Sequence, residues 1–102
     1  MASSAEYLEY VLDLLADVPE VSHRKMMGEY LLYASGKLFG GVYDDRFLVK
    51  STESSRTLLS VPAVSYEGAA EMLLVDMEDK AAVRTIVEGM LQELPEPRKR
   101  RA

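Results

Sequence analysis

Residues 21–51 read VSHRKMMGEYLLYASGKLFGGVYDDRFLVKS, and this stretch decides the fold. Branched and aromatic residues recur in it at a period of two, and glycine or aspartate interrupts them at short intervals, as is typical of strands joined by tight turns. The turn-forming pairs Ser35-Gly36 and Asp44-Asp45 lie about nine residues apart, which favours antiparallel pairing. The sequence therefore predicts a meander of four strands, at residues 22–27, 30–34, 37–43 and 46–50.

A helix is expected on either side of this meander. The segment SSAE at residues 3–6 has the spacing of a capping box, and Pro19 ends the apolar helical repeat that follows it, which places the first helix at about residues 4–17. Asp79 can cap the last helix, in which the apolar residues fall within an arc of about 140° and which Pro95 ends. This narrow apolar face indicates a helix that covers one side of the sheet.

The segment between the meander and the last helix is less regular. Residues 52–59 begin with a threonine that can cap a short helix, residues 61–68 have the composition of a loop, and the apolar run at residues 72–75 suits a fifth strand. The predicted fold class is therefore α+β with two layers: an antiparallel meander sheet of about five strands packed against N- and C-terminal helices.

Length and composition indicate one domain. The chain has 102 residues, of which 48% are hydrophobic and 28% charged, and none is cysteine, so disulfides, thiolate metal sites and cysteine nucleophiles are excluded. Residues 1–95 are expected to form a single α+β domain. No apolar run approaches the roughly 18 residues of a membrane span. The start of the chain carries acidic rather than basic charge, which predicts a cytoplasmic protein without membrane contact.

Charge is divided between an acidic body and a basic tail. The formal net charge is −5, whereas residues 1–97 hold 8 basic and 17 acidic side chains, a balance of −9. Residues 96–102 have no apolar anchor and are expected to be disordered. Binding to nucleic acid should be weak at most and should use this tail, because the body repels phosphate. The candidate tail residues are Arg98, Lys99, Arg100 and Arg101.

The sequence offers little catalytic or metal-binding chemistry. His23 is the single histidine, and no second metal ligand stands at helical or strand spacing from it. Asp44 and Asp45 are neighbours at a predicted turn, where they face water in different directions, so turn formation explains them better than acid-base catalysis. We therefore predict no catalytic residue, no cofactor and no metal.

The first helix has more apolar surface than one sheet face can cover. Its apolar residues spread over an arc of about 200°, and Tyr7, Tyr10 and Leu14 extend beyond the part that the sheet can bury. Two interpretations stay open: the tyrosines lie at the margin of the core with their hydroxyls in water, or they form an exposed strip that contacts another subunit. The second interpretation predicts a homodimer, for which an unpaired edge strand of the meander is the alternative surface.

Two adjacent glycines, Gly40 and Gly41, stand inside a predicted strand. Neither the spacing of a phosphate-binding loop nor that of a dinucleotide-binding loop surrounds them. Glycine within a strand marks a bulge or the close approach of another element. We therefore expect a structural role for both.

Three stretches carry a family resemblance: KMMGEYLLY at residues 25–33, GKLFGGV at residues 36–42 and DRFLVK at residues 45–50. In this order and spacing they resemble the N-terminal domain of the TfoX/Sxy competence regulators. The resemblance implies an α+β fold without established catalytic residues. The residues that carry it form the structural motif Met26, Gly28, Tyr30, Gly36, Gly40 and Gly41. Two positions depart from the family's pattern, since Met27 replaces a phenylalanine and Glu29 replaces a second glycine.

The resemblance also implies a role in regulation. Full-length members carry a second, helical domain and are associated with transcriptional activation of DNA-uptake genes; nothing after residue 94 supplies that domain, so we expect a stand-alone module. The first hypothesis is a non-enzymatic cytoplasmic module of bacterial transcriptional regulation that contacts an unidentified protein partner. The alternatives are a weak nucleic-acid-associated protein that uses the basic tail, and a small-ligand binder or enzyme with a groove near Tyr30, Tyr33 and Tyr43.

Overall fold

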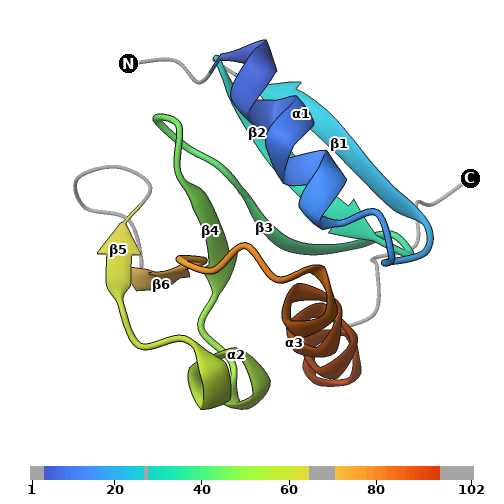
Figure 1. Cartoon of the computed structure of the whole chain (residues 1–102), viewed down its shortest axis with the longest axis vertical. Coiled ribbons are helices and arrows are strands. Elements are labelled where there is room, and N and C mark those ends of the chain that lie inside the picture. The colour runs from blue at the N-terminus through green and yellow to red at the C-terminus, as the bar shows by residue number, and fades with distance from the viewer. Residues whose placement is uncertain (1–3, 27, 65–70, 95–102) are drawn as a thin grey trace, which may run out of the picture.

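The computed structural model describes residues 4–26, 28–64 and 71–94 and shows three helices and six strands within them (Figure 1). In chain order these are α1 (Ala5–Leu14), β1 (Val21–Met26), β2 (Glu29–Ala34), β3 (Lys37–Val42), β4 (Phe47–Lys50), α2 (Glu53–Leu58), β5 (Pro62–Val64), β6 (Glu71–Leu74) and α3 (Lys80–Glu93). The strands form one antiparallel sheet in the order β1-β2-β3-β4-β6-β5. The predicted α+β class, with helices at both ends of the sheet-forming region, is confirmed.

Two-residue turns join β2 to β3 and β3 to β4. Ser35 and Gly36 have φ angles of 52° and 82°, and Asp44 and Asp45 have φ angles of 53° and 55°. Positive φ at both central residues gives the turn a twist that matches the twist of the flanking strands. Aspartate tolerates this backbone region better than most side chains do. The predicted turn role of Asp44 and Asp45 is therefore confirmed.

The sheet has one strand more than the sequence predicts. A loop was the expectation for residues 61–68, but Pro62–Val64 form β5, which pairs with β6 at an edge of the sheet. β5 begins with proline, whose missing N–H is tolerated in an edge strand. A three-residue strand is too short to show a period of two, so its pairing with β6 rather than its own pattern defines it.

The first helix is shorter than predicted and begins one residue later. Ser4 is its N-cap, and Ser4 Oγ accepts a hydrogen bond from the backbone N–H of Tyr7 at 3.1 Å. The third helical position is therefore Tyr7 and not Glu6, so the predicted capping box, which needs the cap three residues before Glu6, is wrong. At the other end, the N–H of Leu15 is shared between the carbonyls of Val11 and Leu12, and the N–H of Ala16 bonds the carbonyl of Asp13, three residues back. The chain tightens there, and residues 15–17 lie outside the helix.

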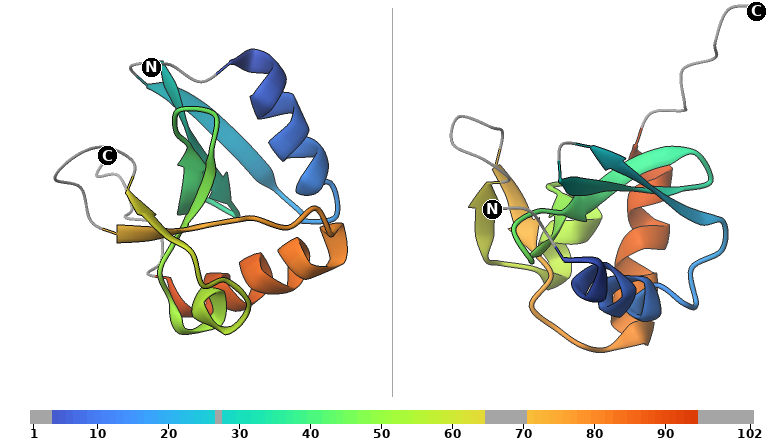
Figure 2. Two further views of the ribbon diagram at one scale, coloured as in Figure 1. Left: turned by 60° about the vertical axis from the view of Figure 1, so that its left-hand side comes forward. Right: turned by 90° about the horizontal axis from the view of Figure 1, so that it is seen from above.

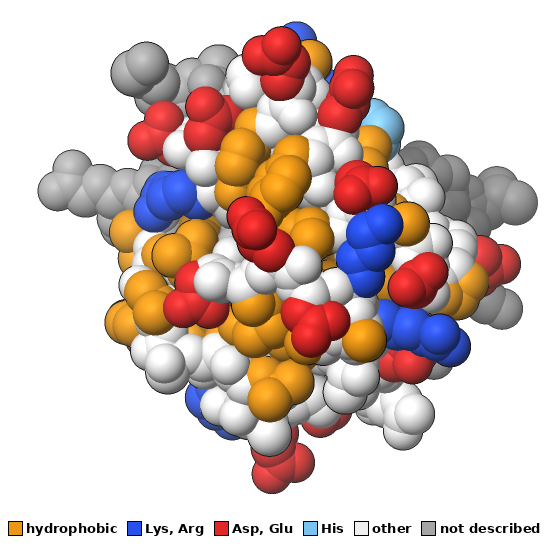
Figure 3. Space-filling view, in the orientation of Figure 1, with side chains coloured by type: hydrophobic (Ala, Val, Ile, Leu, Met, Phe, Trp, Pro, Cys, Tyr) orange, Lys and Arg blue, Asp and Glu red, His pale blue; other side chains and the backbone are white. Residues whose placement is uncertain are grey.

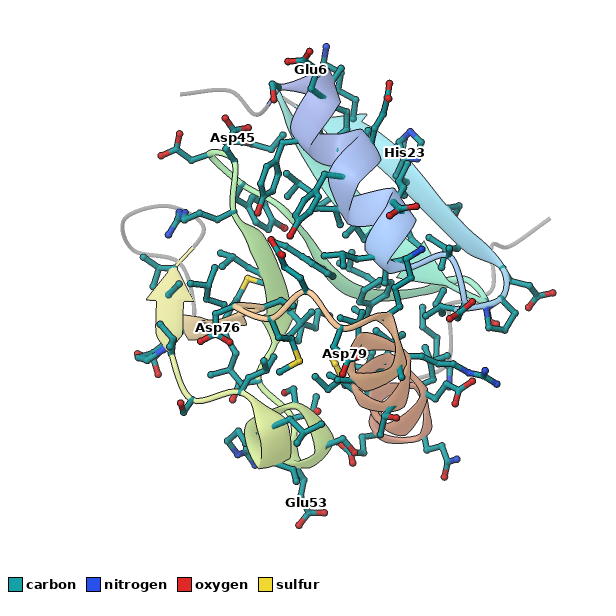
Figure 4. All side chains as sticks on the ribbon, viewed as in Figure 1. Glu6, His23, Asp45, Glu53, Asp76 and Asp79 are labelled. Atoms are coloured by element: carbon teal, nitrogen blue, oxygen red, sulfur yellow. The ribbon has the colours of Figure 1, made fainter. Side chains whose placement is uncertain are left out.

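The turn between β3 and β4 is tied to both neighbouring elements. The backbone N–H of Ser4 donates to Oδ1 of Asp45 at 2.9 Å, and Figure 4 shows Asp45 near the first turn of α1. The N–H of Asp44 donates to Oε1 of Glu29, at the start of β2, at 3.1 Å. One turn therefore links the helix layer to the sheet.

Side-chain caps begin the two later helices where the sequence predicts them. Oγ1 of Thr52 accepts from the N–H of Ser55 at 3.2 Å, and Oγ of Ser55 accepts from the N–H of Thr52 at 2.7 Å, which is a complete capping box for α2. Asp79 caps α3 by accepting from the N–H of Ala81 at 2.9 Å. The predicted starts of both helices are confirmed.

One face of the sheet carries the core. α1 and α3 lie on the same side of the sheet, as the two views of Figure 2 show. The buried cluster joins Tyr30, Leu32 and Ala34, which are alternate residues of β2, to Val11 of α1 and Val83 of α3. Because side chains alternate along a strand, the residues between them in β2 belong to the opposite face.

Candidate interaction site on the open face of the sheet

The face of the sheet opposite α1 and α3 is called the open face here, and it is apolar too. Cross-strand pairing aligns Leu31 of β2 with Gly41 of β3, then with Leu48 of β4 and Leu74 of β6. In β2, β3, β4 and β6, the apolar side chains that the register places on this face are Leu31, Tyr33, Leu38, Leu48, Met72 and Leu74. They make a second apolar layer that is separate from the core cluster.

Burial differs within this layer. Leu48 is 0% exposed although it is not part of the core cluster. Leu31, Tyr33 and Leu74 are half-buried. The open face therefore combines a buried centre with a partly exposed apolar margin, whereas a sheet face that meets only water is normally polar.

Both glycines of β3 lie where a neighbouring group leaves no room for a side chain. A Cβ on Gly40 would lie 2.2 Å from the backbone oxygen of Leu48 in β4, and one on Gly41 would lie 2.7 Å from Cε2 of Tyr43. The pairing of β2 with β3 also shifts between Leu32 and Tyr33, so β3 has a bulge there. The sequence predicted a bulge or a close approach, and the structure shows both.

The tyrosines of α1 lie on the helix-bearing face, which carries many acidic side chains with apolar ones between them (Figure 3). The rings of Tyr7 and Tyr10 have centroids 5.5 Å apart. Tyr10 is 39% exposed, and its hydroxyl donates to Oε2 of Glu78 at 2.8 Å. This hydrogen bond to a carboxylate raises the pKa of Tyr10, and burial raises the pKa of Tyr7.

Leu14 does not belong to an exposed strip. It is 5% exposed and part of the core cluster, so its prediction as an interface residue is wrong. Residue 14 and residue 11 both point into the core because they are three positions apart on the helix. The candidate strip on α1 is therefore reduced to Tyr7 and Tyr10.

The groove near three tyrosines is not formed. Tyr30 is 8% exposed in the core, whereas Tyr33 stands an odd number of positions further along β2, on the open face. Tyr43 covers Gly41, which also belongs to the open face. A groove that used Tyr30 together with the other two would have to pass through the sheet, so this prediction is wrong.

The other predicted motif residues have local roles. Gly28 and Gly36 have φ angles of 84° and 82°, which glycine adopts without strain. Met26 ends β1 and is 48% exposed. Glu29, which replaces a glycine of the family's pattern, accepts the hydrogen bond from Asp44. Met27 and the tail residues 98–101 lie outside the described residues.

In the described part of the chain, His23 and the acidic residues do not gather into a metal site. His23 is exposed on β1 beside α1 (Figure 4), with its ring 6.1 Å from the ring of Tyr30. Across residues 4–26, 28–64 and 71–94, no three His, Cys, Asp or Glu side chains are grouped so that they could hold a metal ion. Among the described helices, none has the length and apolar character needed to cross a membrane.

The fold and the open face together define a small two-layer α+β module with helices on one side of its sheet. The TfoX N-terminal domain family matches residues 13–83, and the chain belongs to this family. It is also similar to an uncharacterized 12.7 kDa protein in the trpE 5′ region of Spirochaeta aurantia, with 30% identity over 106 aligned residues that cover 100% of this chain and 92% of that protein. The family resemblance inferred from the meander is therefore confirmed.

Sequence reasoning missed the open face, although a signal for it exists. Strands with one face in water alternate apolar and polar residues, whereas β2, β4 and β6 contain the continuous apolar runs YLLYA, FLV and MLL. Continuous runs are typical of strands that are covered on both faces. These runs therefore predict a second apolar layer that contains Leu31, Leu48 and Leu74.

Proposed function

We propose that this chain is a non-enzymatic module of bacterial transcriptional regulation that works in the cytoplasm by binding another protein through the open face. The observation that carries the proposal is the partly exposed apolar margin formed by Leu31, Tyr33 and Leu74. Apolar surface with aromatic side chains is typical of the centre of a protein interface. Membership in the TfoX N-terminal domain family supports the regulatory part.

A second copy of the chain is one partner that this face would accept. The homodimer predicted from the sequence relied on Tyr7, Tyr10 and Leu14, but Leu14 is buried and the Tyr10 hydroxyl is bound to Glu78. The open face offers more apolar side chains than the remaining two rings do. We therefore assign self-association to the open face rather than to α1.

Light scattering on two charge variants tests this assignment. The wild-type chain is expected at twice its mass of 11.4 kDa. Leu31→Glu places a charge on the open face and should give a monomer, whereas Tyr10→Glu, with the same change of charge on α1, should keep the dimer. A dimer that is lost only with Tyr10→Glu would contradict the assignment.

Capture of partners from bacterial extract tests the wider proposal. The immobilised wild-type chain should retain at least one protein that the Leu31→Glu variant does not retain. Thermal melting of the variant should show that it is folded. Identical sets of bound proteins for both chains would contradict a role of the open face.

A further inference from the structure

The strand β1 has a free backbone edge. It is the first strand in the sheet order, and among the described residues it pairs only with β2. Five of its six residues are exposed. It contains no proline and no bulge, and these are two of the devices that usually block the addition of another strand.

The register shows which backbone groups are available at this edge. The N–H of Ser35 donates to the carbonyl of Glu20 at 3.0 Å, so residues at even positions from 20 to 26 direct their backbone groups to β2. The backbone groups of Val21, His23 and Lys25 therefore point away from the sheet. They are spaced as a second antiparallel or parallel strand requires.

Two cations on this edge have no partner among the described residues. The described residues include eight lysines and arginines. Five of them form a hydrogen bond or an ion pair with an oxygen atom: Lys37, Arg46, Arg56, Lys80 and Arg84. The three without one are Arg24 and Lys25 of β1, and Lys50 of β4. Arg24 and Lys25 are exposed, with no acidic residue in β1. An acidic chain thus presents an unpaired positive edge.

The charge of this edge argues against a second copy of the chain as its occupant. Two β1 strands paired across a two-fold axis would place the Arg24 and Lys25 side chains of one copy opposite or diagonal to those of the other, and like charges this close destabilise a strand pair. The other free edge, β5, is only three residues long and begins with proline. Neither self-pairing is favourable.

We propose that the β1 edge binds an extended acidic segment of another protein by strand addition. The backbone groups of Val21, His23 and Lys25 would bond the added strand. Because consecutive side chains of a strand face opposite sides, Arg24 and Lys25 select acidic residues on both faces of that strand. This inference uses the backbone of β1 and two cations at the edge rather than the apolar side chains of the open face, although Arg24 lies on that face as the cross-strand partner of Leu31.

A labelled peptide tests the proposal by fluorescence anisotropy with the full chain. The probe is a short peptide with two adjacent glutamates flanked by threonine and valine, and it should bind. Two control peptides should not bind: one has lysines in place of the glutamates, and the other is N-methylated at alternate backbone nitrogens. Failure of the N-methylated peptide would show that backbone hydrogen bonds carry the binding.

Three variants locate the binding. Arg24→Glu should weaken it by about threefold to thirtyfold, in line with cross-strand charge pairs. Lys50→Glu makes the same change of charge at an unpaired cation on a central strand and should leave the affinity unchanged. His23→Pro removes an outward N–H that the pairing with β2 does not use, so the fold should survive while binding is lost.

The proposal is overturned by several results. The first is that the acidic peptide does not bind the wild-type chain. The second is that Arg24→Glu and Lys50→Glu weaken peptide binding equally. The third is that a folded His23→Pro variant binds the peptide as well as the wild-type chain does. The last result would place the peptide elsewhere, for example on the basic tail. If His23→Pro does not fold, equal binding of the N-methylated and ordinary peptides overturns the proposal instead. Loss of the interaction in Leu31→Glu but not in Arg24→Glu would also move the site to the open face.

Discussion

The two faces of the sheet are built from alternate residues of the same strands, yet they differ in what covers them. Leu32 faces α1 and α3 and is 0% exposed, whereas Leu31 faces the other side and is half-buried. On the open face only the centre, at Leu48, reaches complete burial. Apolar composition therefore does not by itself distinguish a core face from a surface face, because an apolar face becomes part of the core only where another element packs on it.

The largest difference between the faces should appear when Leu32 and Leu31 are each replaced by alanine. Leu32→Ala leaves a cavity in the core and should lower the free energy of unfolding by about 2–5 kcal/mol. Leu31→Ala removes a side chain that is already in contact with water and should cost about 1 kcal/mol. Urea unfolding of both variants checks this, and equal losses would show that the open face is as tightly packed as the core.

The sequence predicts the turns that determine which residues share a face of the sheet. The positions of Ser35-Gly36 and Asp44-Asp45 fixed the turns, and those turns set which residues of β2 share a face. Short-range chemistry of this kind depends on neighbours along the chain, so it is visible in the sequence.

Other features depend on contacts between distant segments and were not readable. β5 exists because it pairs with β6, and Leu14 is buried because of how α1 rests on the sheet. The hydrogen bond from Tyr10 to Glu78 joins residues that are 68 positions apart. Such contacts decide whether an apolar side chain on a helix is a core residue or a surface residue.

Gly40→Val tests how closely β4 approaches β3 at Gly40. The first carbon of the valine side chain would lie 2.2 Å from the Leu48 carbonyl oxygen, a backbone atom that can move only if β3 and β4 separate. We expect a loss of about 1–3 kcal/mol, measured by thermal melting.

Gly89→Ala is the control for this substitution. The new Cβ would lie 2.6 Å from Oγ and 2.9 Å from Cβ of Ser54, so the short helix α2 must shift slightly rather than two paired strands separate, and alanine favours a helix more than glycine does by about 1 kcal/mol. The loss should therefore be smaller than for Gly40→Val. An unchanged melting temperature for Gly40→Val would contradict the close approach of β4.

The smallest predicted effect lies outside both faces, where α2 meets α3. The carboxylate of Glu93 accepts hydrogen bonds from the Ser54 hydroxyl and, at 3.1 Å, from the Ser54 N–H. These bonds lower the pKa of Glu93 below 4.5. Because the folded pKa lies below the unfolded pKa, the stabilisation is present above the unfolded pKa and is lost as the pH falls through the folded pKa.

Ser54→Ala removes the stronger of these bonds and should move the pKa of Glu93 back towards 4.5. Carboxyl titration by NMR measures the shift. Thr57→Ala, on the same short helix, removes a hydroxyl that donates to the backbone carbonyl of Glu53 instead. It should leave the pKa of Glu93 unchanged. A shift of equal size in both variants would show that the hydroxyl of Ser54 is not the cause.

The strand order has a consequence for the way the chain folds. Neighbours in the β1–β4 meander are joined by two-residue turns, so Met26 can meet Glu29 as soon as that part of the chain exists. Leu48 and Leu74 pair only after the intervening segment, residues 49–73, has closed into a loop. Closing a longer loop costs more conformational entropy before its contacts form. The meander should therefore be protected first in pulsed hydrogen exchange, and β6 should join it late, as the step that completes both faces of the sheet at once.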